Sequence, residues 1–324
     1  MSIEQIIQTR RLPLLFLLPF LLAGIIAAYR YTGEIPRVCH AETGILLSFL
    51  DKYRDARWLF WSGAAWLLLL SYLLFFISDR REVFSRATAL TAFIYLILSA
   101  GVFCHHGTCA HVIAALPVVL ALSRLQLVIT RLNSNAPLFD FGLLIVFPVL
   151  FCPKLVLLLP WAISVLPLSG RTTLRDVMAL FLGFFTALLL VSAYFFLFDD
   201  WEGARERFMN TLRAGEWPDY HFHPRTWVAI VLLVAVTLVA VSHALTRTLH
   251  EIVSRRRGLL SIISLSFFLG GTFFLVPLHC HAFLFILFIP LSYLHASYLV
   301  AYGGRWTGRL VFLALVTAGI LMIP

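Results

Sequence analysis

The chain has 324 residues, of which 61% are hydrophobic and only 13% are charged, and its mean hydropathy is +0.92. Soluble proteins carry roughly 25% charged residues, so this composition excludes a soluble enzyme or binding domain and indicates a polytopic membrane protein. The net charge of +9 would suit nucleic-acid binding in a soluble protein. In a membrane protein, however, positive charge more often sets orientation, and we expect no nucleic-acid partner.

The first apolar run, residues 12–29, follows Arg10 and Arg11. A cleavable signal peptide needs a small-residue cleavage site after a shorter apolar core, which residues 27–31 supply poorly, so we expect a retained first span. Further runs predict membrane helices over residues 58–78, 87–103, 112–123, 177–198, 227–245, 259–278, 282–300 and 310–323. The predicted fold is therefore an all-α transmembrane bundle forming a single integral membrane domain over residues 1–324.

The central stretch, residues 135–176, determines how the chain is threaded through the bilayer. It contains two apolar runs, residues 141–152 and 155–168, separated only by Pro153 and Lys154. Each run is short for a crossing of roughly 20 residues, so the pair could form one kinked span or a short hairpin. A kinked span would place the two ends of the stretch on opposite sides of the membrane, whereas a hairpin would place them on the same side.

Charge favours the hairpin, which gives about eleven spans, with the N-terminus inside and the C-terminus outside. The predicted inner side then holds fifteen basic and six acidic residues, whereas the outer side holds ten of each. The kinked alternative would move the arginines at positions 171, 175, 255–257, 305 and 309 to the outer side. Because short inner loops are enriched in arginine and lysine, the hairpin fits the bias and the kinked span does not.

Two loops of appreciable length are predicted on the outer side, at residues 31–57 and 199–226. In the first, residues 43–53 place apolar side chains on one helical face, which predicts an interfacial helix. The second begins with acids that suit the start of a short helix over residues 201–212. On the inner side, Asp140 is predicted either as a helix N-cap, which we favour, or as a buried partner of Arg131.

Several motifs of the central region resemble a known family. Residues 119–196 contain Arg124 and Arg131, an FDFG motif at 139–142, a TTLRD turn at 172–176, and Gly183 in the next span. Together these resemble an uncharacterised family of multi-spanning bacterial inner-membrane proteins. The resemblance implies location in the bacterial inner membrane and a multi-pass fold.

The same region is more loosely similar to the C-type glycosyltransferases, which use polyprenyl-phosphate-linked sugars. The features that carry this similarity are Gly142, the Pro153-Lys154 break, and the arginines of the turn that follows. The similarity implies a polyprenyl-phosphate-linked (glyco)lipid substrate at the outer face, and a catalytic acid in the first outer loop, where Glu34 or Glu42 could take that place. That loop contains no adjacent pair of acids, which is a departure from the family pattern.

Outer carboxylates are the candidates for general-base work or metal binding, although each alone is also explained as a solvated loop charge. The candidate catalytic residues are Glu34, Glu42 and Asp199. Outer cations could bind a lipid-linked phosphate or could extend to ordinary lipid headgroups. The candidate phosphate-binding residues are Arg37, Lys154 and Arg225, of which Lys154, at the hairpin tip, is the strongest.

Most histidines and all five cysteines fall near the predicted outer ends of the spans. Imidazole and thiolate ligands could bind zinc or copper there, so a divalent metal is a candidate cofactor. The metal candidates are Cys104, His105, Cys109 and His279. A histidine-lined polar cavity, disulfides, or polar residues that mark the membrane boundary explain the same pattern.

His295 lies inside a predicted span, and an intramembrane ionisable residue is a functional candidate by default. Two functional hypotheses follow. The first is an enzyme-like inner-membrane protein that binds a polyprenyl-phosphate-linked donor among the membrane lipids. The second is a non-enzymatic transporter, or an assembly subunit that binds another envelope protein through its outer loops.

Overall fold

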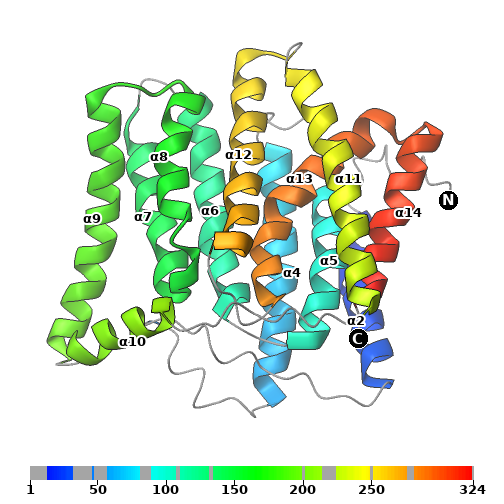
Figure 1. The fold of residues 1–324 in the computed structure, drawn as a ribbon, viewed down its shortest axis with the longest axis horizontal. Helices are drawn as coiled ribbons and strands as arrows, with labels where there is room; N and C mark the ends of the chain where they lie inside the picture. Colours follow the sequence, from blue (N-terminus) through cyan, green and yellow to red (C-terminus); the bar gives the residue numbers. More distant parts are fainter. Residues whose placement is uncertain are drawn as a thin grey trace.

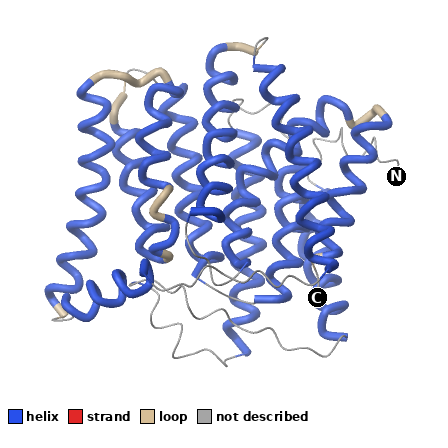
Figure 2. Tube along the Cα trace, in the orientation of Figure 1, coloured by secondary structure: helices blue, strands red, loops and turns tan. Residues whose placement is uncertain are grey.

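A computed structural model describes residues 13–31, 46, 57–80, 89–106, 110–130, 134–198, 201–213, 224–248, 251–275 and 281–322. These residues form twelve α-helices and two short 3-10 helices and contain no strand (Figures 1 and 2). The predicted all-α class is therefore confirmed for the described part of the chain.

The helices follow the predicted apolar runs closely, because each run of apolar side chains must be buried or must face lipid. In chain order they are α2 (Pro13–Tyr31), α4 (Arg57–Arg80), α5 (Leu90–His106), α6 (Ala110–Thr130), α7 (Ala136–Phe151), η2 (Pro153–Leu155), α8 (Leu158–Ser169), α9 (Leu174–Leu197), α10 (Trp201–Arg213), α11 (Pro224–Thr248), α12 (Val253–Leu275), η3 (His281–Phe283), α13 (Leu284–Tyr302) and α14 (Trp306–Leu321).

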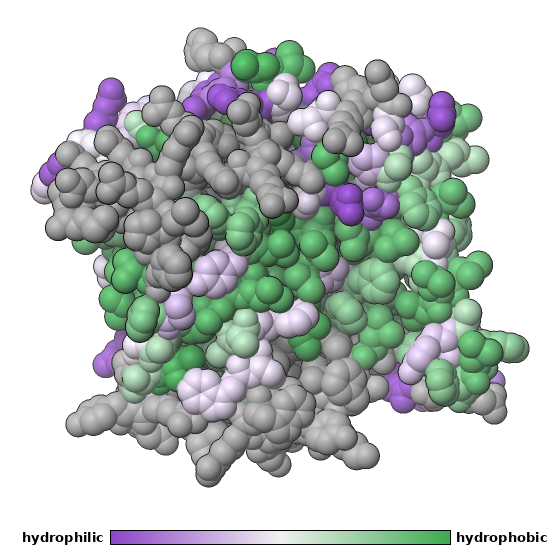
Figure 3. Space-filling model, turned by 180° about the vertical axis from the view of Figure 1, so that it is seen from behind, coloured by the Kyte–Doolittle hydropathy of each residue, from purple (hydrophilic) through white to green (hydrophobic). Residues whose placement is uncertain are grey.

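Among the described residues, five helices are long and apolar enough to cross a membrane. Those segments are Phe60–Ser78, Ala110–Thr130, Leu174–Leu197, Trp227–Thr248 and Leu284–Tyr302. Five shorter apolar helices accompany them. From behind, hydrophobic side chains fill the middle of the molecule and hydrophilic ones gather towards the upper edge (Figure 3). These features are those of a membrane protein.

Arginines are concentrated at one end of the bundle, which is uppermost in Figure 1 and carries the α8–α9, α11–α12 and α13–α14 turns. We call it the arginine end, defined by Arg171, Arg247, Arg257 and Arg305. Helix α10 lies at the opposite end, packed against η2, and we call this the α10 end. The predicted short helix over residues 201–212 is confirmed as α10, one residue longer.

The central stretch turns back on itself. Arg171, just after α8, donates hydrogen bonds to the carbonyl oxygen of Ser134 at 2.6 Å and to Oδ1 of Asn135, just before α7, at 3.3 Å. The two ends of the stretch therefore meet at the arginine end, which is the geometry of a hairpin and not of one kinked span. The return occurs at η2, where Pro153 cannot donate a backbone hydrogen bond.

Helix α9 begins with a capping box that is tied to the same arginine. Thr173 Oγ1 accepts from the backbone N–H of Asp176 at 3.2 Å, and the Asp176 carboxylate accepts from the backbone N–H of Thr173 at 3.2 Å. The other carboxylate oxygen of Asp176 lies 3.0 Å from Nη1 of Arg171. One buried ion pair thus joins both ends of the hairpin to the start of α9.

The prediction that Asp140 caps a helix is wrong. Helix α7 begins a turn earlier, at Ala136, with Asn135 as the N-cap residue. Pro137 suits the first turn of a helix, because the backbone N–H groups there have no partner within the helix. Asp140 lies inside α7, where its carboxylate pairs with Arg124 at 3.5 Å on the surface of the protein.

Helices α7 and α9 cross at two glycines. A Cβ at Gly183 would overlap the carbonyl oxygen of Phe139, and a Cβ at Gly142 would overlap that of Leu180. The two backbones can approach this closely only because both positions lack a side chain. The outer side of α9 exposes large apolar residues such as Phe185 and Leu189, as expected of a helix that faces lipid.

Candidate functional site

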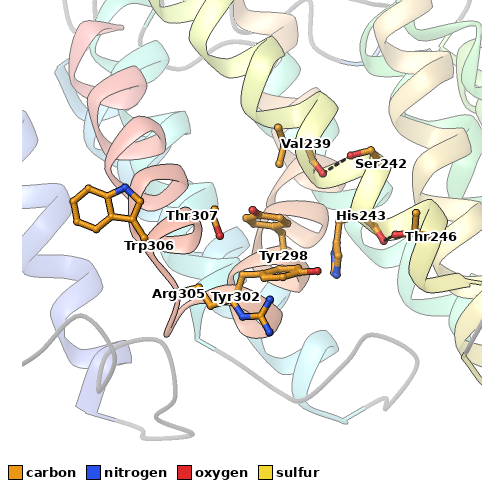
Figure 4. A pocket seen from close by; sticks show the side chains of 9 residues that line it. All are labelled: Val239, Ser242, His243, Thr246, Tyr298, Tyr302, Arg305, Trp306 and Thr307. Carbon is orange, nitrogen blue, oxygen red and sulfur yellow. Dashed lines mark hydrogen bonds between the residues drawn. The ribbon is translucent and has the colours of Figure 1, made fainter.

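A pocket of about 560 Å³ lies between α11, α13 and α14 at the arginine end (Figure 4). This volume is within the roughly 300–1,000 Å³ typical of small-molecule sites. The lining residues are Val239, Ser242, His243, Thr246, Tyr298, Tyr302, Arg305, Trp306 and Thr307. The pocket therefore combines aromatic surface with a small number of polar and cationic groups.

Three aromatic rings form one wall. The rings of Tyr298 and Tyr302 stack with their centroids 5.1 Å apart. The imidazole of His243 meets them edge to face, at 5.4 Å from Tyr298 and 4.8 Å from Tyr302 (Figure 4). The guanidinium carbon of Arg305 lies 5.2 Å from the Tyr302 ring centroid, a cation–π distance.

Helical spacing brings these residues together. The residues that α11 contributes recur at positions 239, 242, 243 and 246, which form one stripe of a 3.6-residue helix. Tyr298 and Tyr302 are one turn apart on α13. Between α13 and α14, a Cβ at Gly308 would overlap the Tyr302 carbonyl oxygen, so only glycine allows the turn to hold Arg305 over the Tyr302 ring.

Not all of the polar groups in the wall are internally satisfied. Ser242 Oγ donates to the Val239 carbonyl at 2.9 Å, and Thr246 Oγ1 donates to the His243 carbonyl at 2.8 Å. The buried Nδ1 of His243, in contrast, has no hydrogen-bond partner among the described residues. A buried polar atom without a partner is costly, so the wall of the pocket contains one unsatisfied nitrogen.

The pocket is electrostatically suited to an anion. None of its lining residues is acidic, and no described carboxylate pairs with Arg305. The neighbouring Glu251 is already occupied by Arg247 at 2.7 Å and by Arg255 at 3.5 Å. An anion in the pocket would therefore meet an unpaired guanidinium, which is the side chain best suited to phosphate and carboxylate groups.

Apolar side chains surround the opening of the pocket. Val239 is 44% exposed on α11, and Leu310 is 49% exposed on the next turn of α14. Trp306, also at the opening, is 72% exposed, and tryptophan is enriched where lipid meets water. A molecule with an anionic group and an apolar tail could therefore place its charge in the pocket and its tail along α11 and α14.

The phosphate-binding residues predicted from sequence lie elsewhere. Lys154 is fully buried in η2 at the α10 end, and Arg225 is exposed at the start of α11. The third, Arg37, lies outside the described residues, as do the candidate catalytic acids Glu34, Glu42 and Asp199. The structure therefore leaves these roles as predictions.

The metal prediction falls largely on residues that are not described. Cys109, His279 and the side chain of His105 lie outside the described part of the chain, whereas Cys104 is a buried free cysteine. The described residues contain no group of three or more potential metal ligands. They do contain one pair that the sequence did not predict, with Cys152 Sγ 3.2 Å from Nε2 of His111 at the α10 end.

The intramembrane histidine, His295, is fully buried on α13. Its Nε2 lies 3.3 Å from Oγ1 of Thr237 on α11. Sequence reasoning therefore identified one residue near the pocket but missed the pocket itself. The available signals were the stripe of residues 239, 242, 243 and 246 and the tyrosine pair one turn beyond His295.

Comparison of the chain with protein families, with curated proteins and with solved structures found no match.

Proposed function

We propose that this is a multi-pass inner-membrane protein that binds a lipid-linked phosphate, with the phosphate group in the pocket beside Arg305. The observation that carries the proposal is a guanidinium without an acidic partner among the described residues, in a pocket whose opening is bordered by lipid-facing side chains. We expect the guanidinium of Arg305 to bind the charged headgroup and the apolar side chains at the opening to contact the tail.

The pocket supplies several donors for such a headgroup. Arg305 offers a fork of N–H groups, His243 offers an imidazole nitrogen, and the phenol of Tyr302 lies between them. The resemblance to C-type glycosyltransferases favours a polyprenyl-phosphate-linked lipid as the ligand. Its apolar chain would lie along exposed residues such as Val231 and Leu313.

The proposal places the ligand at the cytoplasmic side, because positive charge marks the inner ends of membrane helices. This differs from the outer-face substrate that the resemblance implies. An enzymatic reaction would need the outer acids, which lie outside the described residues, so binding is the function that the described residues support.

Binding can be tested with methyl farnesyl phosphate, a phosphodiester with a short prenyl chain, on the detergent-purified protein. We expect Arg305→Ala to weaken binding by about 10- to 100-fold, since hydrogen bonds to charged groups contribute roughly 1.5–3 kcal/mol. Arg305→Lys should retain part of the affinity, and Arg205→Ala, which removes a matched exposed arginine on α10, should retain all of it.

Three further ligands identify what is recognised. Farnesol lacks the charge, dimethyl phosphate lacks the chain, and phosphatidylglycerol carries the same phosphodiester on an ordinary membrane lipid. We expect the first two to bind at least about tenfold more weakly. Equal binding of phosphatidylglycerol would reduce the proposal to a general anionic-lipid site, and equal loss of affinity in the two arginine-to-alanine variants would refute it.

A further inference from the structure

A line of polar residues continues from the pocket into the core of the bundle, along the contact between α11 and α13. On α11, Thr237 lies six residues before His243, a rise of about 9 Å. On α13, His295 lies three residues before Tyr298, on the same face and about one turn away. Tyr298 touches the pocket histidine, so only one turn separates His295 from the pocket wall.

His295 is incompletely satisfied where it lies. Its side chain is fully buried, and Nε2 has the hydroxyl of Thr237 as its partner at 3.3 Å. Its other nitrogen, Nδ1, has no hydrogen-bond partner among the described residues. A histidine retained for packing alone would be expected to have both nitrogens paired, because an unpaired polar atom in the core is costly.

The surroundings offer a protonated His295 no counter-charge. Helix α13 packs against α5, α6, α11, α12, α14 and η3, and none of these six helices contains an acidic residue. The only acid of α4, whose Leu74 carbonyl accepts a hydrogen bond from Tyr293, is its penultimate residue, Asp79.

The other titratable or charged groups on these helices are neutral or positive. They are Tyr95, Cys104, His105 and His106 on α5, His111 and Arg124 on α6, Arg225, His243 and Arg247 on α11, Arg255, Arg256 and Arg257 on α12, His281 on η3, Tyr293, Tyr298 and Tyr302 on α13, and Arg309 on α14 with Arg305 at its start. A negative charge near His295 must therefore come from outside these helices. The pocket is the place where a ligand could supply it.

We propose that His295 takes up a proton when an anionic headgroup occupies the pocket, so that lipid binding and protonation are coupled. A proton from water would bind Nδ1, while Nε2–H donates to Oγ1 of Thr237. The resulting imidazolium and the phosphodiester anion stabilise each other. This inference rests on the proposed function and adds to it a proton as the second ligand.

The coupling has a definite sign. Because the protonated state and the anion favour each other, affinity for the phosphodiester should rise as pH falls. Two unit charges about 10 Å apart in a partly buried site interact strongly enough to change affinity about tenfold. We expect that change between about pH 6 and 4, because burial disfavours the protonated imidazole, and the charge of the phosphodiester itself is constant over this range.

Isothermal titration calorimetry with methyl farnesyl phosphate tests the coupling in two buffers of different ionisation enthalpy at about pH 5. The wild type should take up more protons on binding than His295→Gln, by up to about half a proton, which is the largest difference that a tenfold coupling allows. His295→Gln should still bind, with a weaker dependence of affinity on pH, because His243 in the pocket remains titratable. His111→Gln, an equally buried histidine at the α10 end, should behave as the wild type.

A second measurement uses the wild-type protein alone, so it remains valid even if His295→Gln does not fold. In protein with ¹⁵N-labelled histidine, ligand should shift one buried neutral imidazole signal part of the way to imidazolium at about pH 5. Binding with equal proton uptake in wild type and His295→Gln, or with no such signal change, would overturn the inference and leave the proposed function standing. Absence of binding by the wild type would overturn both.

Discussion

Two arginines at the same end of the molecule have opposite surroundings. Arg171 is buried and bonded to Asp176, Asn135 and Ser134, so it holds separate parts of the chain together. Arg305 rests on the ring of Tyr302 and has no acidic partner among the described residues. Since an arginine cannot lose its charge, the first is structural, and the second is the one that we propose to bind an anion.

Breaking the buried ion pair should destabilise the protein strongly. Arg171 and Asp176 are each only 5% exposed, so Arg171→Ala would leave a buried carboxylate without its cation, at a cost of roughly 3 kcal/mol or more. Arg124→Ala, which removes a pair whose members are 46% and 41% exposed, should cost less than about 1 kcal/mol. Thermal unfolding in detergent measures both, and similar losses would show that Arg171 is not a structural connection.

At the level of elements, the helices were predictable because apolar runs in a membrane protein leave the backbone few alternatives. The predicted runs and the observed helices agree in order, and their ends differ by up to seven residues, the largest difference being at the end of α6. Asp140 is an exception, because it was predicted to be a helix N-cap and lies inside α7. Its neighbours looked like the start of a helix, but Pro137 is also compatible with a first turn, so α7 begins at Ala136.

The contact between α7 and α9 depends on the absence of two side chains. Gly183→Ala would force a methyl group against the Phe139 carbonyl, and backbone atoms cannot move aside cheaply, so we expect a loss of about 1–3 kcal/mol. Gly270→Ala, on α12, is the matched control, because nothing lies within 4 Å of its Cβ position. That change should be neutral or stabilising by roughly 0.5–1 kcal/mol.

Melting temperatures of the two glycine variants, measured in the same detergent, decide the matter. A lower melting temperature for Gly183→Ala together with an unchanged or higher one for Gly270→Ala is the expected result. If Gly183→Ala unfolds at the wild-type temperature, α7 and α9 do not cross as closely as described.

At the level of the whole molecule, the sequence predicts an orientation for the bundle but did not predict its pocket. An orientation can be predicted from the charge bias by counting the arginines in each loop, and this count needs only the sequence. The pocket requires knowing that residues 239–246 and 298–307, far apart in the chain, lie side by side. His243 and Arg305 looked like ordinary residues at the inner ends of spans until the packing of α11, α13 and α14 brought them together.

The hairpin makes a testable statement about orientation. Reporter fusions in a bacterial host should report the cytoplasm when the chain is truncated after Gly170, and the outer compartment when it is truncated after Arg213. The reason is that one long apolar helix, α9, separates these positions, and the arginines of the α8–α9 turn favour the inner side. An outer location for Gly170 would reverse the assignment of the arginine end.

Photo-crosslinking is the most direct test that the pocket binds a lipid-linked phosphate. The ligand would be methyl farnesyl phosphate carrying a diazirine next to the phosphorus, applied to protein in nanodiscs, with labelled peptides identified by mass spectrometry. We predict labelling within residues 239–246 and 298–307, prevented by excess unlabelled ligand and strongly reduced in Arg305→Ala. Saturable labelling confined to the surroundings of Lys154 and α10 would contradict the account and place the site at the opposite end of the bundle.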